Sequence, residues 1–409
     1  MKSNEPPIKG IRVLDLSRVL AGPFCSMTLA DLGAEVIKVE IPGRGDDTRA
    51  YPPFINGVSS YFLSLNRGKK SVTLDLKKAE AREALYRLAE HSDVLLENFR
   101  PGVTKRLGVD YETIKKVNSR LVYCSISSFG QTGPYSSWPG YDLIIQGMGG
   151  LMGITGEPGR PPVRIGVAIT DIGAGMWAVI AILAALRVRD RTGEGQHIDV
   201  SMLDSSVSWM TYVAGNYFAT GQVPPRMGSA HPSLVPYQGF EAADGRYILI
   251  AAGNDRLWAL LCKGIGLENL ARDPRFTTAN KRVENRNKLI PALEQVFKKR
   301  NRDEWLERLR GLGFPCAPVY TIDEIFSDTH VLHRGMLVYM EHAKAGHIKQ
   351  IGPALKFSKT PCVLSSPPPL LGEHTEEVLR SIAAYTDDDI EGLRRAGAMA
   401  FSPRSDKGK

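Results

Sequence analysis

IRVLDLSRVLAGPFCSMTLADLGAEVIKVE, residues 11–40, contains the clearest structural pattern in the chain. Its two ends, IRVLDL (11–16) and EVIKVE (35–40), are short runs rich in Ile, Val and Leu, a composition typical of buried strands. Between them, AGPFCSMTLADLGA (21–34) predicts a helix that ends at Gly33. A strand, a helix and a second strand in this order predict parallel strands joined by a crossover. The chain therefore begins as an α/β protein.

The alternation of strands and helices continues to about residue 200. Further strands are predicted at SVTLDL (71–76), DVLLEN (93–98) and LVYCSISSFG (121–130), and a periodic helix at KKAEAREALYRLAEHS (77–92). We therefore expect residues 1–200 to form the N-terminal part of a large α/β lobe.

The pattern changes after residue 200. DSSVSWMTYVAGNYFATG (204–221) predicts one long apolar helix, and the proline-rich stretch after it predicts a connection, so residues 201–236 are expected to be helix and linker. One strand and three helices predict a smaller α+β lobe at 237–335. Residues 336–409 are expected to form a linker and return to the large lobe, and their last residues, FSPRSDKGK, to fray.

Composition limits the classes of function. The 409 residues carry a formal net charge of +8 and a pI near 9.1, which favours anionic ligands. Hydrophobic residues make up 43% and charged residues 23%, which excludes a disordered chain as the default. Acidic residues are interspersed with the basic ones, and no basic block with stacked aromatics occurs, so we expect no nucleic-acid partner.

Cysteine usage and the N-terminus predict a compartment. The five cysteines are widely spaced with no C-x-x-C pair, which predicts neither disulfides nor zinc and fits a reducing environment. MKSNEPPIKG has the pattern of neither a signal nor a transit peptide, so we expect neither. We expect a cytoplasmic protein, or a mitochondrial matrix protein if the source is eukaryotic and a transit peptide is missing. The apolar run 172–186 is shorter than a membrane span and predicts a buried helix, so no membrane partner is expected.

Asp171 precedes this apolar run in VAITDIGAG. One interpretation is a helix N-cap, in which the carboxylate accepts a backbone N–H from the first turn. The other is a nucleophile: a carboxylate at a helix N-terminus stays ionised at neutral pH, and small neighbours (Gly173, Ala174, Gly175) allow a bulky substrate to approach.

Three other kinds of motif bear on possible ligands. The glycine-dense stretch 146–159 lacks the G-x-G-x-x-G spacing that a dinucleotide cofactor needs. The histidines form no four-ligand set with Cys or carboxylates, so no metal is expected. Basic residues cluster in three loops and are either solvated or a phosphate subsite; they are Arg44, Arg49, Arg67, Lys69, Lys70, Arg100, Lys105 and Arg106.

Together, these segments resemble the family III CoA-transferases (the CaiB/BaiF type) from about Ile11 to Leu379. The matching motifs are LAGPFCSMTLADLGAEVIKVE, GDDTR, NRGKKSVTLDLK, ENFRPG, GQTGP, AITDIGAG, RTGEGQHIDVSMLD and PPPLLGEHTEEVL. Within the family, GSAHPSLVPYQGFEAADG is most similar to the branch that exchanges CoA between succinyl-CoA and glutarate.

The resemblance implies a fold and a reaction. The fold is a large Rossmann-like lobe built from both chain ends, with a smaller α+β lobe between them, in a homodimer of interlocked subunits. The reaction moves CoA from a donor, expected to be succinyl-CoA, to a free dicarboxylic acid. Glutarate is the expected acceptor, and malate, citramalate and itaconate stay open. It needs no metal and no cofactor beyond CoA as substrate.

The resemblance also implies roles for particular residues. Asp171 matches the nucleophile, which forms first a mixed anhydride and then an aspartyl-CoA thioester. The positions that match CoA contacts are Ala21, Leu74, Asp75, Leu76, Lys77, Asn98, Phe99, Arg100, Arg106 and Tyr141. Tyr61 matches a position near the acyl group. The candidates for the acid's distal carboxylate are Arg49, Arg164 and His231, because a buried charge needs a partner.

Some positions depart from the family, and two alternatives remain. Ile41 replaces an Arg that often contacts the adenine nucleotide, and Leu20 replaces the Gln of formyl-CoA transferases. The first alternative is a 2-methylacyl-CoA racemase of the same superfamily, but its G-H-D triplet is Gly140-Tyr141-Asp142 here, and Tyr is a poor base at neutral pH. The second is a non-catalytic acyl-CoA binding protein, which the intact ITDIGAG motif disfavours.

Overall fold

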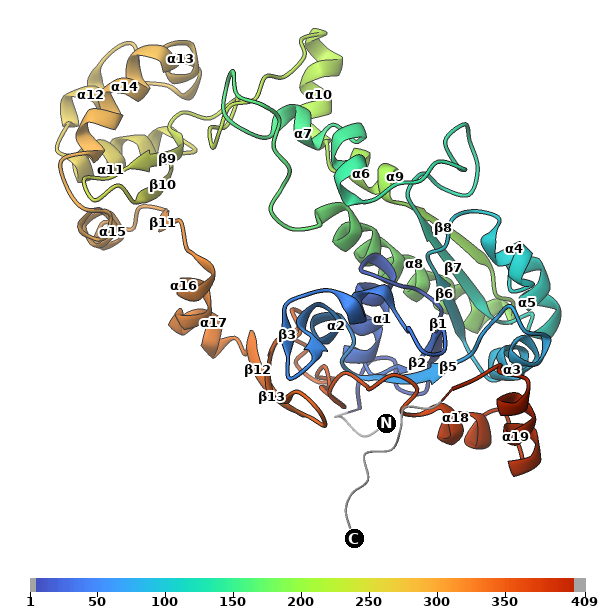
Figure 1. Ribbon diagram of the computed structural model, residues 1–409. Coiled ribbons are helices and arrows are strands. Elements are labelled where there is room, and N and C mark those ends of the chain that lie inside the picture. The colour runs from blue at the N-terminus through green and yellow to red at the C-terminus, as the bar shows by residue number, and fades with distance from the viewer. Residues whose placement is uncertain (1–4, 401–409) are drawn as a thin grey trace. The chain divides into compact units, whose positions relative to one another are not determined.

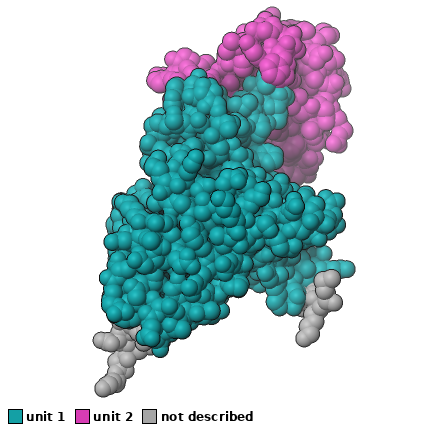
Figure 2. Space-filling model, turned by 90° about the vertical axis from the view of Figure 1, so that its right-hand side faces the viewer, with its two compact units in different colours: residues 1–150, 165–214, 329–409 teal, residues 151–164, 215–328 magenta. Residues whose placement is uncertain are grey.

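A computed structural model describes residues 5–400 of the chain (Figure 1). The chain divides into two compact units, coloured separately in Figure 2: 1–150, 165–214 and 329–409 form the first, and 151–164 and 215–328 the second. Both chain ends thus contribute to the first unit. The predicted helix-and-linker segment 201–236 is divided at residue 214, and 151–164, expected in the large lobe, belongs to the second unit. The tail predicted to fray lies outside the described residues.

The first unit is built on a six-stranded sheet with the order β5-β2-β1-β6-β7-β8, in which every neighbouring pair is parallel. Its strands are β1 (Arg12–Asp15), β2 (Glu35–Glu40), β5 (Lys69–Thr73), β6 (Val94–Glu97), β7 (Val122–Ser127) and β8 (His197–Ser201). The chain runs outward from β1 in one direction and then returns to β6 on its other side. This is the order of a doubly wound nucleotide-binding sheet, so the predicted Rossmann-like α/β fold is confirmed.

Both faces of this sheet are covered, which explains the nearly continuous apolar strands. Successive residues point to opposite faces: Val13 packs with α1 (Ala21–Asp31) and α8 (Ile169–Thr192), whereas Leu14 packs with α3 (Ala79–Glu90). The C-terminal helices α18 (Thr375–Ser381) and α19 (Asp387–Arg395) complete the second of these layers (Figure 1).

The apolar run predicted as a buried helix is the middle of α8. This helix is long and apolar enough to cross a membrane, but half of the relevant stretch is buried, and it packs against α1 and β7. We therefore assign α8 to the core of the first unit. The side chains of Met176, Trp177 and Ile180 are nevertheless exposed.

The single helix predicted over 204–221 is wrong, because the chain forms α9 (Met202–Ser208) and α10 (Thr211–Thr220) instead. The break falls at Thr211, whose φ of 30° is incompatible with a continuous right-handed helix. An apolar pattern alone does not reveal such a break.

The second unit contains an antiparallel sheet in the order β11-β10-β9, with β9 (Tyr237–Glu241), β10 (Tyr247–Ala251) and β11 (Cys316–Pro318). Its core joins these strands to the predicted helices, now α11 (Asp255–Ile265), α14 (Arg286–Phe297) and α15 (Arg302–Gly311). This is the predicted smaller α+β lobe, although residues 329–335, expected in it, belong to the first unit.

The remaining elements are short. They are η1 (Asp47–Ala50), β3 (Phe54–Ile55), β4 (Val58–Ser59), α2 (Ser60–Leu65), α4 (Val103–Leu107), α5 (Tyr111–Val117), α6 (Asp142–Met148), α7 (Leu151–Ile154), α12 (Glu268–Arg272), α13 (Ala279–Glu284), α16 (Ile322–Ser327), α17 (Thr329–His333), β12 (Leu337–His342) and β13 (Gly346–Ile351).

Candidate active site

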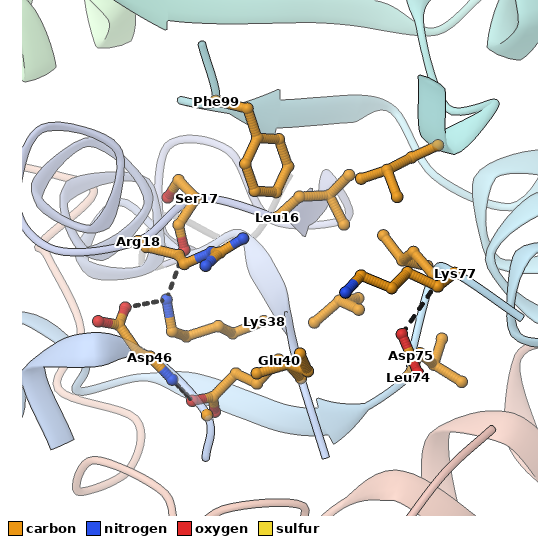
Figure 3. Close-up of a pocket in the computed structure, with 15 residues that line it drawn as sticks. Leu16, Ser17, Arg18, Lys38, Glu40, Asp46, Leu74, Asp75, Lys77 and Phe99 are labelled. Carbon is orange, nitrogen blue, oxygen red and sulfur yellow. Dashed lines mark hydrogen bonds and ion pairs between the residues drawn. The ribbon is translucent and has the colours of Figure 1, made fainter. Parts of the chain in front are cut away.

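A pocket lies where β1, β2, β5 and β6 end (Figure 3). Ligands of doubly wound sheets bind outside the carboxyl ends of the strands, at the point where the strand order reverses. The reversal here falls between β1 and β6. Five of the predicted CoA contacts line this pocket: Leu74, Asp75, Leu76, Lys77 and Phe99.

Several polar lining residues were missed by the sequence analysis, among them Arg18, Lys38 and Asp46. Figure 3 shows the charged groups of Arg18 and Lys77 directed toward the middle of the pocket, beneath the ring of Phe99. The guanidinium carbon of Arg18 lies 5.0 Å from the centre of that ring. The position of Arg18, in the loop that follows the first strand, is the signal that could have identified it.

Asn98 holds Arg18 in place. The backbone N–H of Arg18 donates to Asn98 Oδ1 at 2.8 Å, and Asn98 Nδ2 donates back to the Arg18 carbonyl at 2.8 Å. The side-chain amide is therefore occupied by the loop, so the structure gives Asn98, predicted as a CoA contact, a role in shaping the pocket wall.

A buried ion pair supports the same loop from below. Lys38 Nζ lies 2.8 Å from Asp46 Oδ2, both side chains are 0% exposed, and Lys38 also donates to the Ser17 carbonyl. Burial acts to lower the pKa of Lys38, but Asp46 and Asp15 outweigh burial and raise it. Asp46 Oδ1 also accepts the N–H of Val19, a β-branched residue with a φ of 66°. The ion pair thus holds a strained backbone at the pocket wall.

Most of the clustered basic residues are not available for a phosphate. Arg67 forms a buried pair with Asp31, Lys69 with Asp15, and Lys70 lies between Glu35 and Glu377. By contrast, Arg100 and Arg106 are exposed and join no ion pair within residues 5–400. They do not line the pocket, so their predicted phosphate contacts stay a prediction.

Asp171 lies in the first turn of α8, but it is not the N-cap. The N-cap is Ala168, and Asp171 is the third helical residue. Its half-buried carboxylate accepts no hydrogen bond and joins no ion pair in the described part of the chain. The capping interpretation is therefore wrong, and the carboxylate is unengaged.

The charge state of Asp171 also differs from expectation. Burial, with a further contribution from the nearby Asp142, raises the pKa of Asp171 to about 7. The expected full ionisation at neutral pH is therefore wrong, because desolvation outweighs the favourable end of the helix dipole.

One tyrosine lies near Asp171, and two more follow from it in turn. Burial and the charge of Asp171 raise the pKa of Tyr61, on α2, to about 12, which places Tyr61 beside the carboxylate. The rings of Tyr51 and Tyr61 meet edge to face at 5.6 Å. Burial, Asp47 and Tyr141 raise the pKa of Tyr51, and Tyr141 itself is 71% exposed. Tyr51, which the sequence analysis did not single out, thus neighbours both predicted tyrosines, Tyr61 and Tyr141.

The space beside the glycines that follow Asp171 is occupied by other parts of the protein. A Cβ on Gly173 would lie 1.9 Å from the Trp209 ring, and one on Gly175 would lie 2.7 Å from the Ala21 carbonyl oxygen. Their expected role in admitting a substrate is therefore corrected: they allow α8 to pack closely on its neighbours. The contact at Gly175 joins the predicted CoA segment at Ala21 to the helix that carries Asp171.

The structure places the three candidates for binding the acid's distal carboxylate in different environments. Arg49 is engaged by both carboxylate oxygens of Glu40 at 2.7 Å and lies 3.6 Å from the centre of the Phe62 ring, so it is not available and the prediction is corrected. Arg164 and His231 belong to the second unit. The His231 Nδ1 accepts the N–H of Ser233 at 3.0 Å.

The geometry also bears on a metal site and on a racemase site. Within residues 5–400, no group of three or more His, Cys, Asp or Glu side chains is placed to hold a metal ion. In the Gly140-Tyr141-Asp142 triplet, the Asp142 carboxylate is occupied by Thr170 and Gln146. It is not free to act as the acid or base of a racemase.

Comparisons with known proteins agree with the motifs and the fold. The family model described as CoA-transferase family III matches residues 8–375. A succinyl-CoA:glutarate CoA-transferase of Mus musculus is 45% identical over 394 residues, covering 96% of this chain and 90% of that protein. A succinate–glutarate CoA-transferase of Agrobacterium fabrum is 41% identical over 389 residues, covering 93% and 97%.

A crystal structure of a CAIB/BAIF family protein from Brucella suis has a TM-score of 0.83 and 42% identity, and the match covers 93% of this chain and 100% of that one. The resemblance drawn from the motifs is confirmed. Because the family model and these relatives span nearly the whole sequence, the chain belongs to CoA-transferase family III.

Proposed function

We propose that this enzyme moves CoA from succinyl-CoA to a free dicarboxylic acid, with glutarate as the leading acceptor and Asp171 as the nucleophile. The observation that carries the proposal is the Asp171 carboxylate, which is half-buried and unengaged within residues 5–400 at the start of α8. The names of the relatives support the choice of acids.

The proposed site has two connected parts. The nucleotide end of CoA occupies the pocket at the strand ends, where Arg18 and Lys77 supply positive charge. The thioester end reaches Asp171 along the first turn of α1, which touches α8 at Gly175. A small apolar cluster containing Val19, Leu20 and Ala168 joins the pocket loop to the start of α8.

The reaction then proceeds by acyl exchange. The Asp171 carboxylate attacks the thioester carbonyl of succinyl-CoA, which forms a mixed anhydride and expels the CoA thiolate. The thiolate attacks the aspartyl carbonyl, which forms an aspartyl-CoA thioester and releases succinate. The acceptor carboxylate repeats both steps in reverse, so the new acyl-CoA leaves and Asp171 is restored. The chemistry needs neither metal nor further cofactor, and it fits a cytoplasmic or mitochondrial matrix enzyme.

We further propose that the enzyme acts as a homodimer, and the family resemblance suggests interlocked subunits. Large apolar side chains exposed on α6 and α8 support an interface, because patches of this kind commonly mark protein–protein contacts. They are Leu143, Ile144, Met148, Met176, Trp177 and Ile180.

The decisive experiment traps the intermediate. Enzyme mixed with succinyl-CoA is treated with hydroxylamine or borohydride, digested, and analysed by mass spectrometry. We expect a modified Asp171, and we expect Asp171→Asn to lose both the adduct and transfer to glutarate. Transfer at the native rate in Asp171→Asn, or trapping at another residue, contradicts the proposal.

A panel of acids tests the substrate class. With succinyl-CoA as donor, glutarate and other dicarboxylates should yield new thioesters, whereas monocarboxylates should yield few. Equal transfer to monocarboxylates contradicts the assignment. Incubation with a chiral 2-methylacyl-CoA in deuterated water separates the racemase alternative, since only a racemase exchanges the α-hydrogen.

A further inference from the structure

The helix that carries Asp171 begins without a cap of its own. Its N-cap residue, Ala168, has no side chain able to accept a backbone N–H. Asp142, the first residue of α6, supplies the missing acceptor from outside the helix: its Oδ1 accepts the backbone N–H of Thr170 at 3.0 Å and the Thr170 hydroxyl at 2.8 Å. Thr170 is fully buried and directly precedes Asp171.

The second carboxylate oxygen of Asp142 also accepts a hydrogen bond. Gln146, one turn further along α6, donates from Nε2 to Asp142 Oδ2 at 2.7 Å. Its own Oε1 accepts the N–H of Ile165 at 2.8 Å, in the segment that leads into α8. One buried carboxylate and one buried amide therefore tie α6 to both the lead-in and the first turn of α8.

The charged and titratable groups that face Asp171 come from two elements. Asp142 approaches from α6 and raises the pKa of Asp171, in addition to the larger effect of burial. Tyr61 approaches from α2, and its own high pKa keeps it neutral across the working range. Within residues 5–400, Asp142 is therefore the charged neighbour that acts on Asp171.

We propose that Asp142 is a positioning residue for the nucleophile: it caps α8 through Thr170, fixes the direction of the Asp171 carboxylate, and keeps a negative charge beside it. The charge makes Asp171 more basic, and a more basic carboxylate attacks a thioester more readily once it is ionised. The proposal rests on the proposed function, in which Asp171 carries the acyl group.

Single-turnover formation of the trapped Asp171 adduct, followed against pH, tests both parts of the role. The native rate should rise through about pH 7 as Asp171 ionises. In Asp142→Asn the carbonyl oxygen can still accept from Thr170, but the charge is gone. We expect the acid limb of its pH–rate profile, the pH range over which the rate rises, to move to lower pH by roughly one unit. This is the size of shift that a neighbouring charge produces.

Thr170 variants isolate the cap from the charge. Thr170→Val removes the hydroxyl bond and leaves Asp142 charged, so the adduct should form at least about five-fold more slowly with an unmoved acid limb. Thr170→Ser, which keeps the hydroxyl, should restore the rate. Asp142→Ala, which loses both cap and charge, should be slower than Asp142→Asn.

The outcomes separate this inference from the proposed function. An acid limb in Asp142→Asn that coincides with the native one, or that moves equally in Thr170→Val, overturns the role of Asp142 while the adduct still forms on Asp171. Absence of any adduct in the native enzyme overturns the proposed function instead. Thermal unfolding of each variant identifies one that fails to fold, and the Thr170→Val and Thr170→Ser pair then decides the role of the cap.

Discussion

The pKa of Asp171 is set by two opposing effects. The start of a helix favours a carboxylate, yet burial raises the pKa of Asp171 to about 7. An ordinary Asp in the unfolded chain has a pKa near 3.9. The folded state therefore holds its proton more tightly than the unfolded state, and its stability falls as pH rises through the interval between the two values.

Asp171→Asn should consequently stabilise the protein where the native carboxylate is charged. At pH 8 we expect the free energy of unfolding to increase by on the order of 4 kcal/mol, and at pH 4 to change little, because the native side chain is protonated in the folded state there. Urea unfolding at the two pH values measures this difference. An equal effect at both pH values contradicts the assigned pKa.

The Lys38–Asp46 pair is the second residue-scale feature that can be tested. Lys38→Met leaves Asp46 charged and fully buried, so we expect a loss of about 3–5 kcal/mol in the free energy of unfolding. Lys38→Met combined with Asp46→Asn should recover part of this loss, since no uncompensated charge remains. Lys70→Met provides the control: its partners Glu35 and Glu377 are partly exposed, and it should cost about 1 kcal/mol or less.

At the scale of elements, the contact between α1 and α8 joins the two parts of the site. It is close because Gly175 has no side chain: a Cβ there would lie 2.7 Å from the Ala21 carbonyl oxygen and 3.0 Å from the Phe24 ring. The glycines of this motif thus serve helix packing, and through it they set where Asp171 stands relative to the pocket loop.

Gly175→Ala should therefore both destabilise the protein and impair transfer. We expect a loss of about 1–3 kcal/mol, typical of overpacking, together with a fall in kcat/KM for succinyl-CoA. Gly392→Ala in α19 is the matched control, because nothing lies within 4 Å of its Cβ; it should stabilise by about 0.5–1 kcal/mol and leave transfer unchanged. Calorimetry and steady-state kinetics on both variants check the contrast.

At the scale of the whole molecule, the exposed apolar side of α8 is the feature that the single chain does not explain. Ile180 is 54% exposed and Met176 is 54% exposed on a helix whose other side is core. Water-facing residues of this kind on a central helix are expected where another chain covers them.

Ile180→Asp should weaken self-association. A buried, unpaired charge in an interface typically costs several kcal/mol, so sedimentation velocity should show a larger monomer fraction in the variant than in the native protein. Asp388→Asn, an exposed change on α19, should leave the distribution unaltered. A native protein that sediments as a monomer at all concentrations contradicts the proposed dimer.

Local patterns were sufficient for much of the fold. The strand–helix–strand unit over 11–40 and the periodic helix near 79–90 were predicted correctly, because hydrophobic periodicity and strand composition act over a few residues. The break between α9 and α10 was not predictable, since it depends on the backbone conformation of Thr211. In the site, the run Leu74–Lys77 and Phe99 were identified through motifs, whereas Arg18, Tyr51 and Asp142 were not given roles in it.

By itself, the sequence determined the family, the α/β architecture and the position of Asp171, because these follow from ordered motifs and local apolar patterns. Only the tertiary structure decided which charged side chains are paired and which are left unpaired. Arg49 is paired with Glu40, and Asp142 accepts hydrogen bonds from Thr170 and Gln146. The Asp171 carboxylate, by contrast, has no hydrogen bond or ion pair within the described residues. The physical reason is that pairing and burial depend on residues brought together from distant parts of the chain, and these two effects set the charge of each group.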